Sequence, residues 1–120
     1  MEAVRRQELL AGGIDVDGAL ERFMGSEALL ERFLGKFLQD TNYEALEQAV
    51  ARGDWEEALR ASHTLKGVCG NLSMTRLYDL FTRQVAAIRA GDLAQAAALM
   101  AEIAPARAAA AAAIAGGAGL

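Results

Sequence analysis

The stretch RASHTLKGVCGNLS, residues 60–73, carries the only histidine of the chain, His63. An exposed imidazole is mostly uncharged at neutral pH, and its free ring nitrogen is then a competent nucleophile. Lys66, one helical turn later, can balance negative charge arriving on that nitrogen, as in the transfer of a phosphoryl group. The residue types and their spacing therefore indicate nucleophilic chemistry on an anionic group.

The residues around His63 separate into two faces when they are projected onto a helix at about 100° per residue. Opposite the histidine lies an apolar stripe that we expect to face the core, formed by Ala58, Ala61, Leu65, Val68, Cys69 and Leu72. Within about 60° of the histidine lie Glu56, Leu59, Arg60, Lys66, Gly67 and Gly70. This pattern predicts an exposed histidine, with Leu59 and Arg60 at the edge of a docking face.

Two glycines, Gly67 and Gly70, fall on the histidine side of this predicted helix. An interior glycine costs about 0.5–1 kcal/mol relative to alanine, which this chain otherwise uses freely. Without side chains at these positions, another molecule can approach the imidazole and the helix backbone closely. We expect Gly67 to provide this clearance, whereas Gly70 fits a docking contact and a loosened helix end equally well.

The composition argues against several other functions. One histidine and one cysteine cannot form a zinc ligand set, and no phosphate-binding Gly-x-x-x-x-Gly-Lys-Ser/Thr loop occurs, so we expect no metal and no cofactor on this chain. A net charge of -4 argues against nucleic acid as a partner. No run of 18 apolar residues predicts a membrane span. Any phosphate would have to come from another protein.

The elements that position these residues are expected to be helical, because the chain has a single proline and is rich in alanine. We interpret residues 1–120 as one domain. Capping signals and apolar spacing predict two short helices at 2–10 and 16–23, and four longer ones: at 26–52, at 55–71, after Ser73, and from 93. This order predicts an all-α, antiparallel four-helix bundle with one or two short N-terminal helices.

Local signals add further expectations. The long helix over 26–52 should kink or loosen near QDTNY, where helix propensity falls. Ser73 is the expected N-cap of the following helix. Pro105 should bend or interrupt the last helix, and the alanine-rich tail of the region 93–120 should fray.

The remaining hydrophobic residues are interpreted as core. We expect Phe33, Phe37, Trp55 and Phe81 to be core aromatics, and Cys69 to act as a small hydrophobe without a redox role. The lone cysteine and the lack of a signal peptide favour a cytoplasmic location. Because no long heptad seam is evident, a monomer is favoured.

The histidine stretch resembles the core motif of histidine-containing phosphotransfer (HPt) domains of two-component phosphorelays, in the residues His63, Leu65, Lys66, Gly67, Cys69 and Leu72. The lead-in GIDVDGALERFMGSEALLERFLGKFLQD and the GDW turn are also similar to the family, so the resemblance covers about residues 12–90. It implies a four-helix bundle whose His63 is phosphorylated on Nε2. Such a domain accepts the phosphoryl group from an aspartate of a receiver domain and passes it to another receiver.

The resemblance also implies roles for the neighbouring residues. Lys66 would lie beside the phosphoryl group and Gly67 would leave room for the docked receiver. The receiver would supply the Mg²⁺, and the domain itself would have no stand-alone turnover. Two positions depart from the family pattern: Ser73 replaces a glycine, and Val85 stands where many members have a polar residue. Gln84, one residue earlier, is the candidate contact to the imidazole.

Two other functions remain open at this point. A non-phosphorylated adaptor could bind a receiver or another signalling partner through the same face, but it would have no need of the nucleophile. An independent enzyme, such as a hydrolase built on a bundle, would need a second catalytic group near His63, and the sequence offers none.

Overall fold

The computed structural model describes residues 1–116, whose regular structure is helical apart from one isolated bridge between Ile14 and Met74. Within these residues the order is α1 (Ala3–Ala11), α2 (Val16–Arg22), α3 (Glu27–Gln39), α4 (Asn42–Arg52), α5 (Trp55–Asn71), α6 (Thr75–Arg89), α7 (Leu93–Ala98) and α8 (Met100–Ala115). The predicted all-α fold class is confirmed.

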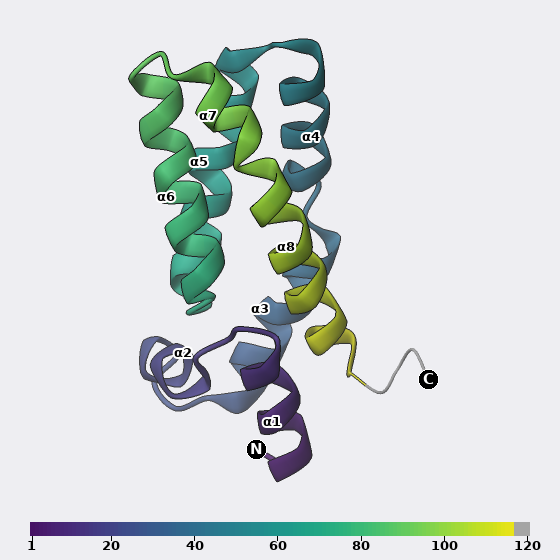
Figure 1. The fold of residues 1–120 in the computed structure, drawn as a ribbon. Helices are drawn as coiled ribbons and strands as arrows, with labels where there is room; N and C mark the ends of the chain where they lie inside the picture. Colours follow the sequence, from purple (N-terminus) through teal and green to yellow (C-terminus); the bar gives the residue numbers. More distant parts are fainter. Residues whose placement is uncertain (117–120) are drawn as a thin grey trace.

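The bundle has four helical segments, here called arms: α3 with α4, then α5, then α6, and then α7 with α8. The first and the last arm are thus each divided into two helices. Figure 1 shows α3 and α4 rising, α5 descending beside α4, α6 rising beside α5, and α7 with α8 descending. Contacts of α8 with both α3 and α6 close the arrangement. Neighbouring arms are therefore antiparallel, as the order of the predicted helices indicated.

The two short N-terminal helices cover one end of the bundle (Figure 1). α1 packs against α8, and α2 contacts both α1 and α3. The connection between α1 and α2 is tied to the connection between α5 and α6, because the backbone N–H of Asp15 donates to the carbonyl of Ser73 at 2.9 Å. The end of the histidine-bearing helix α5 is thus held by residues that precede the bundle.

Capping at the helix ends follows the sequence signals closely. Ser26 and Asp54 accept hydrogen bonds from backbone N–H groups at the starts of α3 and α5, at 3.1 and 3.2 Å. Gly53 and Gly91 adopt the left-handed conformation that favours glycine, with φ of 73° and 76°. Asp92 caps α7 through the Gln95 N–H at 3.2 Å. These boundaries confirm the predicted starts and stops.

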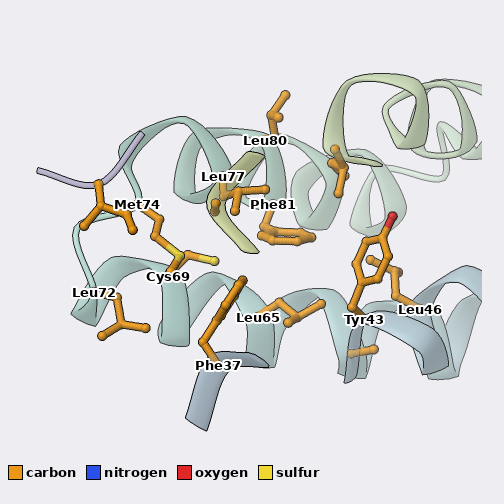
Figure 2. Close-up of a cluster of buried hydrophobic side chains, with 14 of the residues drawn as sticks. Phe37, Tyr43, Leu46, Leu65, Cys69, Leu72, Met74, Leu77, Leu80 and Phe81 are labelled. Carbon is orange, nitrogen blue, oxygen red and sulfur yellow. The ribbon is translucent and has the colours of Figure 1, made fainter. Parts of the chain in front are cut away.

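The core lies between the arms and is built mainly from leucine and aromatic side chains. Figure 2 shows Phe37, Leu65 and Phe81 converging from α3, α5 and α6, and all three are buried. Of the four predicted core aromatics, Phe37 and Phe81 are therefore confirmed. Trp55 is only half-buried and packs at the edge of the core.

The prediction for Phe33 was wrong. Its side chain is 38 % exposed, and it stacks on Phe23 with ring centroids 5.2 Å apart. The Lys36 ammonium lies 4.9 Å from the Phe33 ring centroid. Helical spacing placed Phe33 near the apolar stripe of α3, but α2 supplies a partner ring at the surface, so this side chain is covered without entering the core.

The long helix predicted over 26–52 is two helices, with the break at Asp40 and Thr41. Asp40 is extended, with ψ of 123°, and its carboxylate accepts the Asn42 backbone N–H at 2.7 Å. Short polar side chains offer the backbone such alternatives to the helical hydrogen bond. The QDTNY stretch therefore interrupts the helix completely.

Ser73 does not cap α6, contrary to the prediction. It has φ of 53° and follows the end of α5 in a left-handed turn, in which the Met74 N–H donates to the Cys69 carbonyl at 2.9 Å. Its hydroxyl instead accepts a hydrogen bond from Arg22 of α2. A glycine would adopt this conformation without strain, so a serine here carries a backbone cost that the contact with Arg22 helps to offset.

Pro105 does not interrupt the last arm. α8 continues through it, and the break falls earlier, at Leu99. Proline removes one N–H donor, which in α8 leaves the carbonyl of Ala101 without its helical partner. Ala101 is exposed, so water can satisfy that carbonyl. The loss of this one hydrogen bond is therefore tolerated.

The alanine-rich segment after Pro105 is ordered helix as far as Ala115, so the expectation that it frays was wrong for the described residues; residues 117–120 lie outside them. Ala110 and Ile114 are buried. Arg5 of α1 donates to the carbonyls of Ala113 and Ile114 at 3.0 and 2.9 Å, which caps the end of α8. Tertiary contacts, and not helix propensity, keep this segment in place.

By length and composition alone, one helical stretch among residues 1–116, Leu93–Ala115, could cross a membrane. A core helix of a soluble protein passes the same test, and 28 % of the most apolar window is buried. In this structure the stretch packs against α1, α3 and α6 as the fourth arm of the bundle.

Candidate functional site

His63 lies near the middle of α5 and is exposed, as the helical projection predicted. The residues opposite it, Ala58, Ala61 and Leu65, are buried. Within residues 1–116 no hydrogen bond or ion pair engages the imidazole, so both ring nitrogens are open to solvent or to an incoming group.

Lys66 is half-buried on the side of α5 that faces α6. Its ammonium lies 5.9 Å from the centroid of the Tyr78 ring, which holds a cation by its π-face. The sequence did not single out Tyr78, because this residue lies outside the apolar repeat of α6. The Lys66 cation therefore lies next to α6, on a side chain that leaves α5 about one turn after His63.

The two glycines of α5 differ in what surrounds them. A Cβ added at Gly67 would meet no atom within 4 Å, so the backbone there is open to another molecule. A Cβ at Gly70 would lie 3.1 Å from the ring of Tyr78. The backbone at Gly67 is thus open, as predicted, whereas the Tyr78 ring covers one side of Gly70; a partner contact at either glycine stays a prediction.

A polar hollow lies beside Gly67, between the end of α5, the start of α6 and helix α2. Its lining includes Gly67, Gly70, Asn71, Tyr78, Glu21 and Arg22. A second, more apolar groove shares Arg22 and Asn71 with it and is lined by Phe23, Phe33, Phe37, Val68 and Leu72. Helix α2 and the residues that flank it therefore contribute to the surface next to Gly67, which the spacing within α5 could not reveal.

Leu59 and Arg60 lie one turn before His63 and differ in exposure. Leu59 is half-buried and packs against the core, so less of it is exposed than predicted. Arg60 is exposed and pairs with Glu57, and it donates to the Asn42 side chain of α4 at 3.2 Å. Arg60 thus bridges α5 and α4 at the rim of the histidine face.

Gln84 does not contact the imidazole, so this candidate was wrong. It is fully buried, its Oε1 accepts a hydrogen bond from the Ser62 hydroxyl at 2.8 Å, and its Nε2 donates to the Ala96 carbonyl at 3.0 Å. Nε2 also lies 3.2 Å from the Met100 sulfur. The amide is thus fully occupied inside the bundle, on the side of α6 that faces α5 and α7.

Cys69 is buried in the core, which raises the pKa of its thiol to about 12, chiefly by desolvation, with the charge of Asp40 adding to the effect. A thiol with so high a pKa is not a nucleophile at neutral pH. Among residues 1–116, no three side chains of the metal-binding types converge. Neither the thiol nor a metal cluster therefore offers an alternative to the histidine face among the described residues.

Fold and site together define a helical bundle that presents an unengaged histidine from the middle of one arm. The family model of the Hpt domain matches residues 28–116, well over half of the chain, and the chain belongs to this family. Hpt domains are the histidine carriers of phosphorelays in two-component signalling, and they interact with receiver domains. No curated protein and no solved structure matches the chain.

The extent of the match differs from the resemblance seen in the sequence. The family model begins at residue 28 and ends at 116, whereas the resemblance was placed at about 12–90. The helices α1 and α2 precede the matched region, and the alanine-rich α8 belongs to it. A helix from residue 93 was predicted, but the low-complexity composition of this arm offered no motif by which the resemblance could be extended to it.

Proposed function

We propose that His63 is the phospho-acceptor of this domain, taking the phosphoryl group from a receiver-domain aspartate and passing it to another receiver. The observation that supports this most directly is the exposure of the imidazole beside the open backbone at Gly67. In the transfer, Nε2 attacks the phosphorus, an N–P bond forms, and the P–O bond to the aspartate breaks. The electron pair leaves with the aspartate carboxylate, and the reverse sequence loads the next receiver.

Lys66 and the receiver supply the charge that this transfer needs. The Lys66 ammonium lies 5.9 Å from the Tyr78 ring centroid, one turn of α5 beyond His63, and in this proposal it moves to offset the charge of the phosphoryl oxygens. The Mg²⁺ belongs to the receiver in this proposal, and the carrier itself has no cofactor and no stand-alone turnover. Leu59, Arg60 and Gly67 contribute to the docking surface, and the polar hollow beside Gly67 leaves room for the receiver.

The proposal is tested with a panel of ³²P-phosphorylated receivers. We expect the wild-type protein to acquire label that is labile in acid and stable in alkali, as phosphohistidine is. Because His63 is the only histidine of the chain, His63→Gln should acquire none while it keeps its helicity and its affinity for the receiver. Label that persists on His63→Gln would contradict the assignment, and receiver binding without label on the wild type would indicate an adaptor.

We further propose that the domain acts as a monomer in the cytoplasm. The chain is acidic, with a net charge of -4, and its exposed large hydrophobic side chains are spread over several elements, among them Val4, Phe33, Tyr78 and Leu93. Such scattered residues are ordinary on a monomer surface. Sedimentation equilibrium should give the mass of one chain, and a dimer mass at micromolar concentration would contradict this.

A further inference from the structure

Three arms of the bundle meet at one buried polar cluster, formed by Ser62 of α5, Gln84 of α6 and the backbone carbonyl of Ala96 in α7. The Ser62 and Gln84 side chains are both 0 % exposed. The two hydrogen bonds of 2.8 and 3.0 Å satisfy the amide at both of its ends. Figure 1 shows α5, α6 and α7 side by side at this end of the bundle.

The packing face of α5 around Ser62 is built largely from small residues. Of the five buried residues of α5, Ala58, Ala61, Ser62 and Cys69 are small and only Leu65 is large, and Ala96 is the buried residue of α7. Alanine faces bury similar apolar area at several rotations about the helix axis, so the hydrophobic effect selects among these rotations only weakly. Hydrogen bonds do select among them, because they need a defined distance and direction.

Rotation of α5 matters because Ser62 and His63 are consecutive. Successive residues of a helix lie about 100° apart, so directing Ser62 toward Gln84 directs His63 outward. A turn of α5 by one residue would move the Ser62 hydroxyl away from Gln84 and leave the buried amide oxygen without a donor, which is unfavourable. The cluster therefore penalises those rotations in which the imidazole points elsewhere.

We propose that Gln84 is a positioning residue of phosphotransfer: acting through Ser62 and the Ala96 carbonyl, it sets the rotation of α5 against α6 and α7 and so the direction of His63. Gln84 does not touch the imidazole, and it is no part of the docking surface. The inference rests on the proposed role of His63 as phospho-acceptor. An apolar residue would fill the space of Gln84 equally well, so the proposal gives a reason for a polar side chain at this buried position.

The test compares Gln84→Met with the double variant Ser62→Ala/Gln84→Met. The single variant leaves the Ser62 hydroxyl buried without its partner and should be less stable than the wild type. The double variant removes both polar groups, so its midpoint of urea unfolding should recover toward the wild-type value. The matched control is Gln95→Met, the same substitution at an exposed glutamine of α7.

Transfer from one phosphorylated receiver is then measured at a temperature where each variant is fully folded. We expect kcat about 10-fold to 100-fold lower for the double variant, with KM for the receiver nearly unchanged, because docking is intact and the imidazole is misaligned. Amide NMR signals of α5 should shift or broaden in the same variant. Gln95→Met should match the wild type in every measurement.

A double variant that is stable and transfers at the wild-type rate would overturn the inference, because Gln84 would then serve stability alone. A double variant that fails to fold would overturn it too, since the pair would be required for folding and not for orientation. Both results leave the role of His63 standing. A wild-type protein that acquires no label refutes the proposed function itself.

Discussion

At the scale of single residues, Lys66 should matter for the rate of phosphoryl transfer and little for the stability of the fold. The ammonium is 5.9 Å from the Tyr78 ring centroid and makes no ion pair within residues 1–116. We expect Lys66→Ala to slow transfer at least 10-fold, because the phosphoryl oxygens lose a nearby cation. The free energy of unfolding should change by less than about 1 kcal/mol, since the lost cation–π contact is partly exposed.

Lys66→Arg is the informative companion, because it keeps the positive charge and the stacking on the tyrosine ring. Transfer kinetics with a phosphorylated receiver and circular dichroism measure both effects. If Lys66→Ala lost helicity, its slow transfer would reflect misfolding. If Lys66→Arg were as slow as Lys66→Ala, charge would not be the reason for the loss.

Gly67 lies where stability and docking should oppose each other. A Cβ atom added at Gly67 would meet no atom within 4 Å, and the same is true of Gly35 in α3. Replacing a helical glycine by glutamine should therefore stabilise the fold at either position, by up to about 1 kcal/mol. Gly67→Gln should weaken receiver binding at least 10-fold, because the new side chain fills the approach to the histidine face.

Gly35→Gln is the matched control for this prediction: it should gain the same stability and bind the receiver as the wild type does. Receiver affinity is measured by isothermal titration calorimetry, and stability by urea unfolding. An unchanged dissociation constant for Gly67→Gln would show that the clearance at this position is not used.

At the scale of elements, the sequence predicted what depends on local chemistry. The caps at Ser26, Asp54 and Asp92 and the stops at Gly53 and Gly91 follow from side-chain oxygens and left-handed glycines within a few residues. The exposure of His63 follows from helical periodicity. Such features need no knowledge of the rest of the chain.

Features that depend on residues far away in the sequence were missed, because local spacing and residue type do not show which distant side chains come into contact. Ser73 was read as a cap because no local signal shows that Arg22 reaches its hydroxyl. The alanine tail was expected to fray because the sequence does not show Arg5 capping it. Gln84 is the candidate contact to the imidazole because it is the amide next to Val85, and no local signal shows that its partners, Ser62 and Ala96, come from two other helices.

The contact between α1 and α3 makes a pH-dependent contribution to stability. Arg5 forms a two-pronged ion pair with Glu31, with N–O distances of 2.8 and 2.6 Å, and this hydrogen bonding lowers the pKa of Glu31. A lowered carboxyl pKa stabilises the fold above the ordinary pKa of glutamate, and the stabilisation is lost as the pH falls through the lowered value. Because the pair is partly exposed, we expect Glu31→Gln to cost no more than about 1 kcal/mol at pH 7.

The measurement is urea unfolding of Glu31→Gln and of the wild type from pH 7 to pH 3. The difference between the two proteins should shrink toward zero as the pH falls, because glutamine resembles the protonated acid. Asp17→Asn is the control: its ion pair with Arg6 is more exposed and should matter less. A difference that stayed constant over this pH range would refute the role of the charge.

At the scale of the whole molecule, α1 is attached to the last arm of the bundle by a close approach between its C-terminal end and α8. A Cβ at Gly12, the C-cap of α1, would lie 2.3 Å from the Cβ of Ala113 in α8 and 3.1 Å from the Ala109 carbonyl. With φ of -82° the backbone at Gly12 suits any residue, so space alone requires glycine there. The absence of one methyl group thus lets α1 lie against α8.

Gly12→Ala should therefore destabilise the protein by about 1–3 kcal/mol through overpacking, opposite in sign to a substitution at Gly67. The double variant Gly12→Ala/Ala113→Gly removes the methyl group of α8 that the new one on α1 would meet. It should recover part of the lost stability, less the cost of about 1 kcal/mol for a glycine inside α8. The two effects would then be coupled, because the residues share one contact. Urea unfolding of the wild type, both single variants and the double variant measures this coupling, and strictly additive losses would mean that α1 does not pack on α8 as described.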